Sequence, residues 1–189
     1  MPHTTRHLLL GLLAIAVSGR AAAQDKCAAK GSWAGKAFTM THCAVAVYDG
    51  KSVALWLSEA PIPAAEVETF HLSSYPQPYG PGNKPRTMIG LSFCLGGGKE
   101  SASAAAVQTV ELAVNHAADP MIAQQWVFEL PRDKDLRFEK LSGELKPGGK
   151  LTGRVTGKKT TDQQQAYSWT IEFDVRLPER AAGAGLSCD

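Results

Sequence analysis

Residues 167–177 alternate strictly between large apolar and polar side chains. The odd positions hold Tyr, Trp, Ile, Phe, Val and Leu, and the even positions hold Ser, Thr, Glu, Asp and Arg. Alternation of this length is typical of a β-strand with one buried face. A helix would spread the apolar side chains around its circumference and expose several of them. The segment therefore predicts a strand, with Glu172 and Asp174 pointing to solvent.

Further segments carry strand signals and turn signals. Residues 38–48 and 52–58 flank Asp49-Gly50, a pair that readily adopts the positive φ angles of a type I′ hairpin turn. Other candidate strands are residues 86–95, 107–116, 125–130, 136–145 and 151–156, with a turn at residues 146–149. The candidate helices, residues 64–70 and 101–106, are too short to be the crossovers of a parallel sheet. The pattern predicts an all-β, antiparallel β-sandwich of about seven to nine strands, immunoglobulin-like or jelly-roll-like.

Residues 1–23 have the composition of a cleaved secretory signal peptide. Arg6 and His7 precede an apolar run at residues 8–17, and Ala21-Ala22-Ala23 follows it. The run is half as long as the roughly 20 residues that span a bilayer, so we expect no membrane anchor after cleavage. Residues 24–189 have a length suited to one β-sandwich domain. The predicted location is periplasmic or secreted.

Removal of the signal peptide changes the charge of the chain. The full sequence has 20 Lys and Arg residues against 18 Asp and Glu residues, and Arg6 and Arg20 leave with the signal peptide. The mature chain is therefore formally neutral and lacks the excess positive charge of a nucleic-acid-binding protein. One basic stretch, residues 132–159, is interpreted as a solvated strand surface.

The four cysteines are expected to form disulfides, because export places them in an oxidising compartment. Four cysteines allow three pairings, which the sequence does not distinguish. Position along the chain favours Cys27 with Cys188, which lie near the two ends of the mature chain. It also favours Cys43 with Cys94, which lie in two predicted strands.

Motifs for catalysis or cofactor binding do not emerge. Gly90-Leu91-Ser92-Phe93-Cys94 departs from the Gly-x-Ser-x-Gly elbow of hydrolases and is interpreted as strand. The glycines at residues 96–98 have neither the spacing nor the Ser or Thr of a phosphate-binding loop. The sequence favours a protein without catalytic activity or cofactor; the alternative enzyme is an envelope hydrolase with carboxylates from distant strands.

The proline-rich loop of residues 75–85 is the candidate partner-binding segment. Its prolines restrict the backbone, so Tyr75 and Tyr79 would be presented at little entropic cost. An exported, neutral, disulfide-bonded sandwich suggests a binding protein of the bacterial envelope. We expect a protein partner in the envelope, with an inhibitor or immunity-type role.

A small-ligand or copper carrier is the alternative binding function. Met40, His42 and Cys43 are close in sequence, and soft ligands suit copper(I). On a strand, however, His42 and Cys43 point to opposite faces, which leaves Met40 and His42, with His116 as a further candidate. Two ligands do not make a metal site, so the prediction is that no metal is bound.

Overall fold

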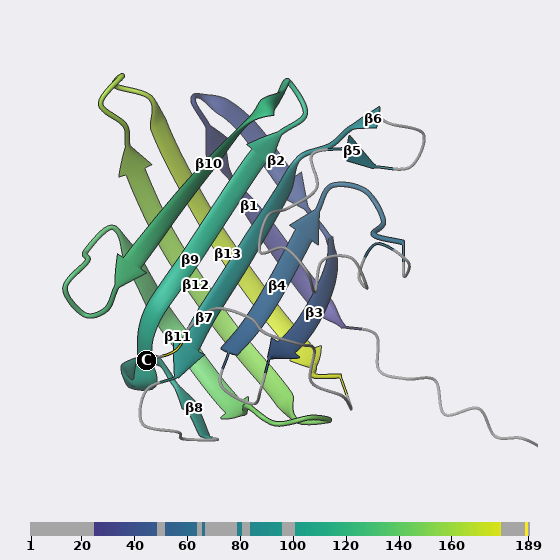
Figure 1. Cartoon of the computed structure of the whole chain (residues 1–189), viewed down its shortest axis with the longest axis vertical. Coiled ribbons are helices and arrows are strands. Elements are labelled where there is room, and N and C mark those ends of the chain that lie inside the picture. The colour runs from purple at the N-terminus through teal and green to yellow at the C-terminus, as the bar shows by residue number, and fades with distance from the viewer. Residues whose placement is uncertain are drawn as a thin grey trace, which may run out of the picture.

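The computed structural model describes residues 25–48, 52–63, 66, 79–80, 84–95, 101–178 and 188. Two antiparallel sheets, one of six strands and one of five, pack face to face. Figure 1 shows the layers one behind the other, with the strands of one sheet crossing those of the other in projection. The predicted all-β antiparallel sandwich is confirmed. The proposed signal peptide, residues 1–23, lies outside the described residues.

The six-stranded sheet has the order β2-β1-β13-β12-β11-β8, and the five-stranded sheet has the order β10-β9-β7-β4-β3. The strands of the first are β1 (Lys26–Trp33), β2 (Lys36–Met40), β8 (Ser101–Ser103), β11 (Leu136–Glu144), β12 (Lys150–Thr160) and β13 (Ala166–Arg176). Those of the second are β3 (His42–Tyr48), β4 (Ser52–Ser58), β7 (Met88–Leu95), β9 (Val107–His116) and β10 (Asp119–Glu129). A small separate sheet pairs β5 (Tyr79–Gly80) with β6 (Lys84–Pro85).

Several predicted elements differ from the structure. The strand expected at residues 38–48 is divided at Thr41, where the chain passes from β2 in one sheet to β3 in the other. The segment 101–106 forms β8 and a 3-10 helix, Ala104–Ala106, rather than an α-helix. The turn at Asp49-Gly50 lies outside the described residues, whereas the turn at 146–149 is confirmed, with Gly148 at φ 71°.

The core forms where the inward faces of both sheets meet. In β13, Tyr167, Trp169, Ile171, Phe173 and Val175 are all buried, as the alternation predicts. Aromatic rings connect the layers: Trp126 of β10 stacks on Trp169 at 5.6 Å, and Phe93 of β7 packs edge-on against Phe138 of β11 at 5.1 Å. Such pairs add to the hydrophobic stabilisation of the buried area.

One row across the six-stranded sheet alternates large and small residues. Phe38, Gly31, Trp169, Gly157 and Leu136 are directly paired neighbours on β2, β1, β13, β12 and β11. A Cβ on Gly31 would lie 2.7 Å from Phe38 Cζ, and one on Gly157 would lie 2.5 Å from Trp169 Cζ2. The aromatic rings therefore occupy the space that side chains at the glycines would take.

The two disulfides differ from the favoured pairing. Cys27 is bonded to Cys43 and Cys94 to Cys188, with Cα–Cα distances of 5.9 and 5.5 Å. The favoured Cys43–Cys94 bond is wrong because Cys43 is opposite Leu57 at one end of β4, whereas Cys94 is opposite Ser52 at the other end. By strand alternation, these two cysteines also point to opposite faces of the sheet.

All four cysteines are oxidised, as expected for this chain. Disulfides persist in oxidising compartments, so they indicate an extracytoplasmic location. No helix in the described part of the chain has the length and hydrophobicity needed to cross a lipid bilayer.

The outer face of the five-stranded sheet carries a second buried cluster. Ala46, Tyr48, Ala54, Trp56 and Met88 form it, separately from the main core. Tyr48 is 6% exposed, and burial raises its pKa to about 12. The phenol is therefore held in its neutral form well above the pH at which an exposed tyrosine ionises.

Ionisation of Tyr48 is expected to destabilise the fold at alkaline pH. In the unfolded chain, Tyr48 loses its proton near pH 10, whereas the folded chain retains it to about pH 12. The unfolded state therefore binds fewer protons in this window, and the free energy of unfolding falls as pH rises from 10 to 12. Urea denaturation at pH 9, 10.5 and 11.5 measures the fall, which should be smaller in Tyr48→Phe. An equal fall in both proteins would contradict the assignment to Tyr48.

Candidate functional site

The outer face of the six-stranded sheet is polar. Along β12 and β13, inward apolar residues alternate with outward Ser, Thr, Lys, Arg, Asp and Glu residues. Glu172 is exposed and the carboxylate of Asp174 is 45% exposed, which confirms that both point to solvent. This is the face that the last strand's alternation predicts to be solvated.

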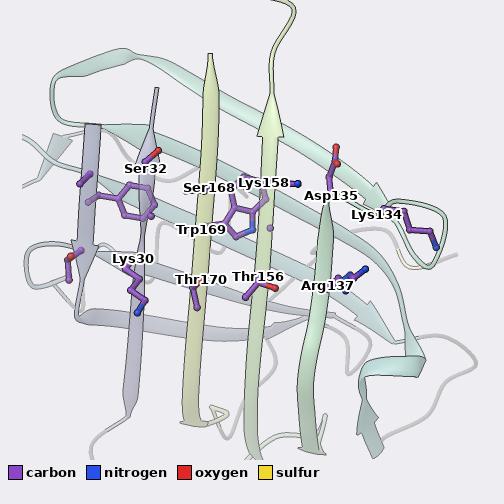
Figure 2. A pocket seen from close by; sticks show the side chains of 15 residues that line it. Lys30, Ser32, Lys134, Asp135, Arg137, Thr156, Lys158, Ser168, Trp169 and Thr170 are labelled. Carbon is purple, nitrogen blue, oxygen red and sulfur yellow. The ribbon is translucent and has the colours of Figure 1, made fainter. Parts of the chain in front are cut away.

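A hollow of about 890 Å³ lies on this face. Its centre is shallow because the outward residues there are short, and they include Ser32, Thr39, Thr156, Ser168 and Thr170. Figure 2 shows Ser32 on β1, Thr156 on β12, and Ser168 and Thr170 on β13, with Arg137 on the neighbouring β11. We call this depression the first hollow.

Long basic side chains surround the first hollow. Lys30, Lys134, Arg137 and Lys158 contribute four positive charges, whereas Asp135 is the one carboxylate in the lining. The carboxylate of Asp135 already forms an ion pair with Lys159, with 2.9 Å between Oδ2 and Nζ.

Three of these cations lack an acidic partner. Within the described residues, Lys30, Arg137 and Lys158 make no ion pair, while Lys134 donates a hydrogen bond to the Pro131 carbonyl at 2.9 Å. The first hollow therefore concentrates positive charge that no ion pair of the described residues compensates at Lys30, Arg137 and Lys158.

A second hollow of about 640 Å³ on the same face has a different charge balance. Its lining contains three basic and three acidic residues, namely Lys26, Lys140, Arg154, Asp25, Glu172 and Asp174. Arg154 pairs with Glu172 at 3.0 Å and with Glu139 at 2.8 Å, and Lys150 pairs with Asp174 at 3.0 Å. The lining of the second hollow therefore carries no net charge.

Trp169 lines the first hollow from beneath. Figure 2 shows its indole between the backbones of β13 and β12, and the ring stacks on Trp126 of the opposite sheet, on the inner side of the floor. The residue is 3% exposed, and its Nε1–H has no hydrogen-bond partner among the described residues. A buried donor without a partner is uncommon in folded proteins, because desolvation without a hydrogen bond is costly.

The tyrosines proposed to bind a partner fall largely outside the described residues. Tyr75 is outside the described residues. Tyr79 belongs to β5, and the structure describes its backbone only. Tyr79 pairs with Pro85 and Gly80 pairs with Lys84 in a two-stranded ladder. Their role in binding stays a prediction.

The residues of the copper alternative are distributed over different environments. Met40 is completely buried in the core, and His42 is opposite Ser58 on β4. Cys43 is taken up by its disulfide, and His42 points away from it on the strand. Among the described residues, no three His, Cys, Asp or Glu side chains gather in a way that would hold a metal ion.

His116 belongs to an aromatic cluster rather than to a ligand set. Its ring stacks on Trp33 at 6.2 Å, and its Nδ1 accepts a hydrogen bond from the Ala118 amide at 3.0 Å. Burial lowers the pKa of His116, Lys36 lowers it further, and Glu59 opposes them. The neutral ring therefore contributes to packing between β1 and β9.

The residues that a hydrolase would use have structural roles in the described part of the fold. Ser92 is buried in β7, as the strand interpretation predicts. Glu139, Glu172 and Asp174 are paired with basic side chains on the outer face. Glu111 is buried on β9 and accepts a hydrogen bond from Gln125.

Sequence reasoning missed the cations of the first hollow. Lys30 lies on β1, a strand that was not predicted, and Arg137 and Lys158 belong to the basic stretch interpreted as a solvated surface. Their outward positions follow from alternation, but their proximity depends on the strand order β1-β13-β12-β11.

Comparison with known proteins finds no matching family model, no matching curated protein and no matching solved structure.

Proposed function

We propose that this chain is an exported, non-catalytic binding protein of the bacterial envelope that receives a partner protein over the first hollow. The observation that carries the proposal is the uncompensated positive charge of Lys30, Arg137 and Lys158 around a shallow floor of hydroxyl side chains. Charged groups arranged in this way favour a partner of complementary charge and speed its association.

An inhibitor or immunity-type role agrees with this architecture. The outer face is carried by regular strands, so its side chains are held in fixed positions before binding and little order has to be gained. The disulfides suit a protein that works in the periplasm or outside the cell. The catalytic alternative has weaker support, because the carboxylates of the outer face are neutralised by ion pairs.

A bulky substitution in the first hollow tests the proposal. Thr170→Trp fills the centre of the hollow, whereas Thr160→Trp places the same side chain on the exposed end of β12, outside the lining. Immobilised mature wild-type protein should retain one envelope protein at one-to-one stoichiometry. Thr170→Trp should reduce the affinity for it by at least about tenfold, equivalent to ~1.4 kcal/mol, and Thr160→Trp should not.

Two outcomes would count against the proposal. Absence of any stoichiometric partner in the host's envelope would contradict the binding function itself. Equal retention by both tryptophan variants would place the partner elsewhere, and loss of retention in Tyr75→Ala/Tyr79→Ala alone would place it on the proline-rich loop.

A further inference from the structure

The charge difference between the two hollows constrains what kind of ligand fits each. Both lie on one face and share strands β1, β12 and β13. The first has four cations and one engaged carboxylate, whereas the second has equal numbers of both signs. An anionic group is therefore attracted to the first hollow and gains little at the second.

We infer that the part of the partner that enters the first hollow is a short acidic segment of polypeptide, whose carboxylates pair with Lys30, Arg137 and Lys158. This inference rests on the proposed function and adds the chemistry of the partner. The hydroxyls of Ser168 and Thr170 lie on the same floor and offer hydrogen-bond donors to carboxylate oxygens, whereas Thr156 already donates to Glu139 at 3.0 Å.

The zero net charge of the second hollow disfavours a long polyanion. A nucleic acid or sulfated polysaccharide running along β12 and β13 would leave the first hollow and reach Glu172 and Asp174, which already pair with Arg154 and Lys150. Its further negative charges would meet equal numbers of both signs and gain no net attraction there. A segment with its acidic residues concentrated over a short distance places all of its charge at the first hollow.

The indole of Trp169 lies on the inner side of the sheet, beneath the floor of the hollow. Trp169 lines the floor beside Gly157, and its Nε1–H lacks a partner within the described residues. The ring faces the core, where it stacks on Trp126 of the opposite sheet at 5.6 Å, so the ligand does not contact it. Indole emission responds to charge nearby, so Trp169 still reports occupancy of the hollow.

Charge reversal at matched positions tests the inference with a defined probe. The probe is a synthetic decapeptide of alternating Glu and Ser with a fluorescent label, titrated against mature protein. Lys30→Glu/Lys158→Glu changes two cations of the first hollow on β1 and β12. Lys26→Glu/Lys150→Glu makes the same change in net charge on the same two strands, at the other end of the face.

We expect saturable binding of the decapeptide to the wild type, weakened at least about tenfold by Lys30→Glu/Lys158→Glu and less than about threefold by Lys26→Glu/Lys150→Glu. Raising the ionic strength from about 0.05 to 0.5 M should weaken binding, because exposed charge pairs are screened. Tryptophan emission should change on binding, and this change should be much smaller in Trp169→Phe.

Equal weakening by both charge reversals would overturn the inference, because binding would then follow total charge rather than the first hollow. Binding of heparin in place of the peptide, with the same dependence on Lys30 and Lys158, would overturn it as well. If an envelope partner binds over the hollow and keeps its affinity in Lys30→Glu/Lys158→Glu, the acidic segment is wrong and the proposed function stands. If no partner binds at all, the proposed function fails.

Discussion

Replacing Cys94 and Cys188 together by alanine should lower the free energy of unfolding by about 4 to 5 kcal/mol, the larger of the two disulfide effects. The bond joins residues separated by 94 positions, so it removes a large amount of chain entropy from the unfolded state. Cys27→Ala/Cys43→Ala opens a separation of 16 and should cost about 3 kcal/mol. Urea denaturation under oxidising conditions measures both values.

The same proteins provide the control for disulfide connectivity. Each double variant retains one intact native pair, so free-thiol titration should find no reactive thiol in either. Peptide mapping of the non-reduced wild type should recover the fragments that contain Cys27–Cys43 and Cys94–Cys188. Recovery of Cys27–Cys188 would contradict the structure, and so would an unfolding cost that is larger for the shorter loop.

Gly157→Val should destabilise the protein by about 1 to 3 kcal/mol, although valine is a better strand former than glycine. The reason is steric: a Cβ at this position would lie 2.5 Å from Trp169 Cζ2 and nearer still to Cε2 and Nε1. The ring is held in place by Trp126 at 5.6 Å and Phe128 at 6.1 Å, so it cannot move aside freely. Thermal and urea denaturation measure the loss.

A double-mutant cycle identifies Trp169 as the cause. Trp169→Leu makes room at Gly157, so Gly157→Val/Trp169→Leu should be less destabilised than the sum of the two single variants, by at least about 1 kcal/mol. Lys158→Ala, on the adjacent exposed position, should change stability by less than about 0.5 kcal/mol. Additive single variants would show that the ring and the glycine are not in contact.

Strand alternation made much of the fold predictable from sequence. The prediction for residues 107–116 coincides with β9, and that for 167–177 differs from β13 by one residue at each end. β13 carries its large apolar residues on one face, so its period of two is clear, whereas β9 is buried on both faces from Val110 to Asn115. β1 escaped prediction because its inward positions include Ala29 and Gly31, whose small side chains give little hydrophobic signal.

Properties that depend on which strands become neighbours were not predictable. The split of residues 38–48 at Thr41 arises because the chain changes sheets there, and nothing in the local sequence marks the change. The disulfide pairing failed for the same reason, since distance along the chain says nothing about which strand faces Cys43 or Cys94.

The first hollow was partly visible in the sequence. Alternation places Lys158, Ser168 and Thr170 on the solvated side, so the polar character of the face is predictable. Its charge excess is not, because Lys30 and Arg137 come from strands distant in sequence that join the same sheet. The register between β12 and β13 also places Arg154 opposite Glu172 and Lys158 opposite Ser168.

Site-specific crosslinking measures the location of the proposed partner most directly. A photoreactive amino acid at position 156, in the floor of the first hollow, should crosslink one envelope protein with high yield. The same group at position 127, whose valine is 60% exposed on β10 of the other sheet, should not crosslink it. Crosslinking from 127 and none from 156 would contradict the binding of a partner over the first hollow.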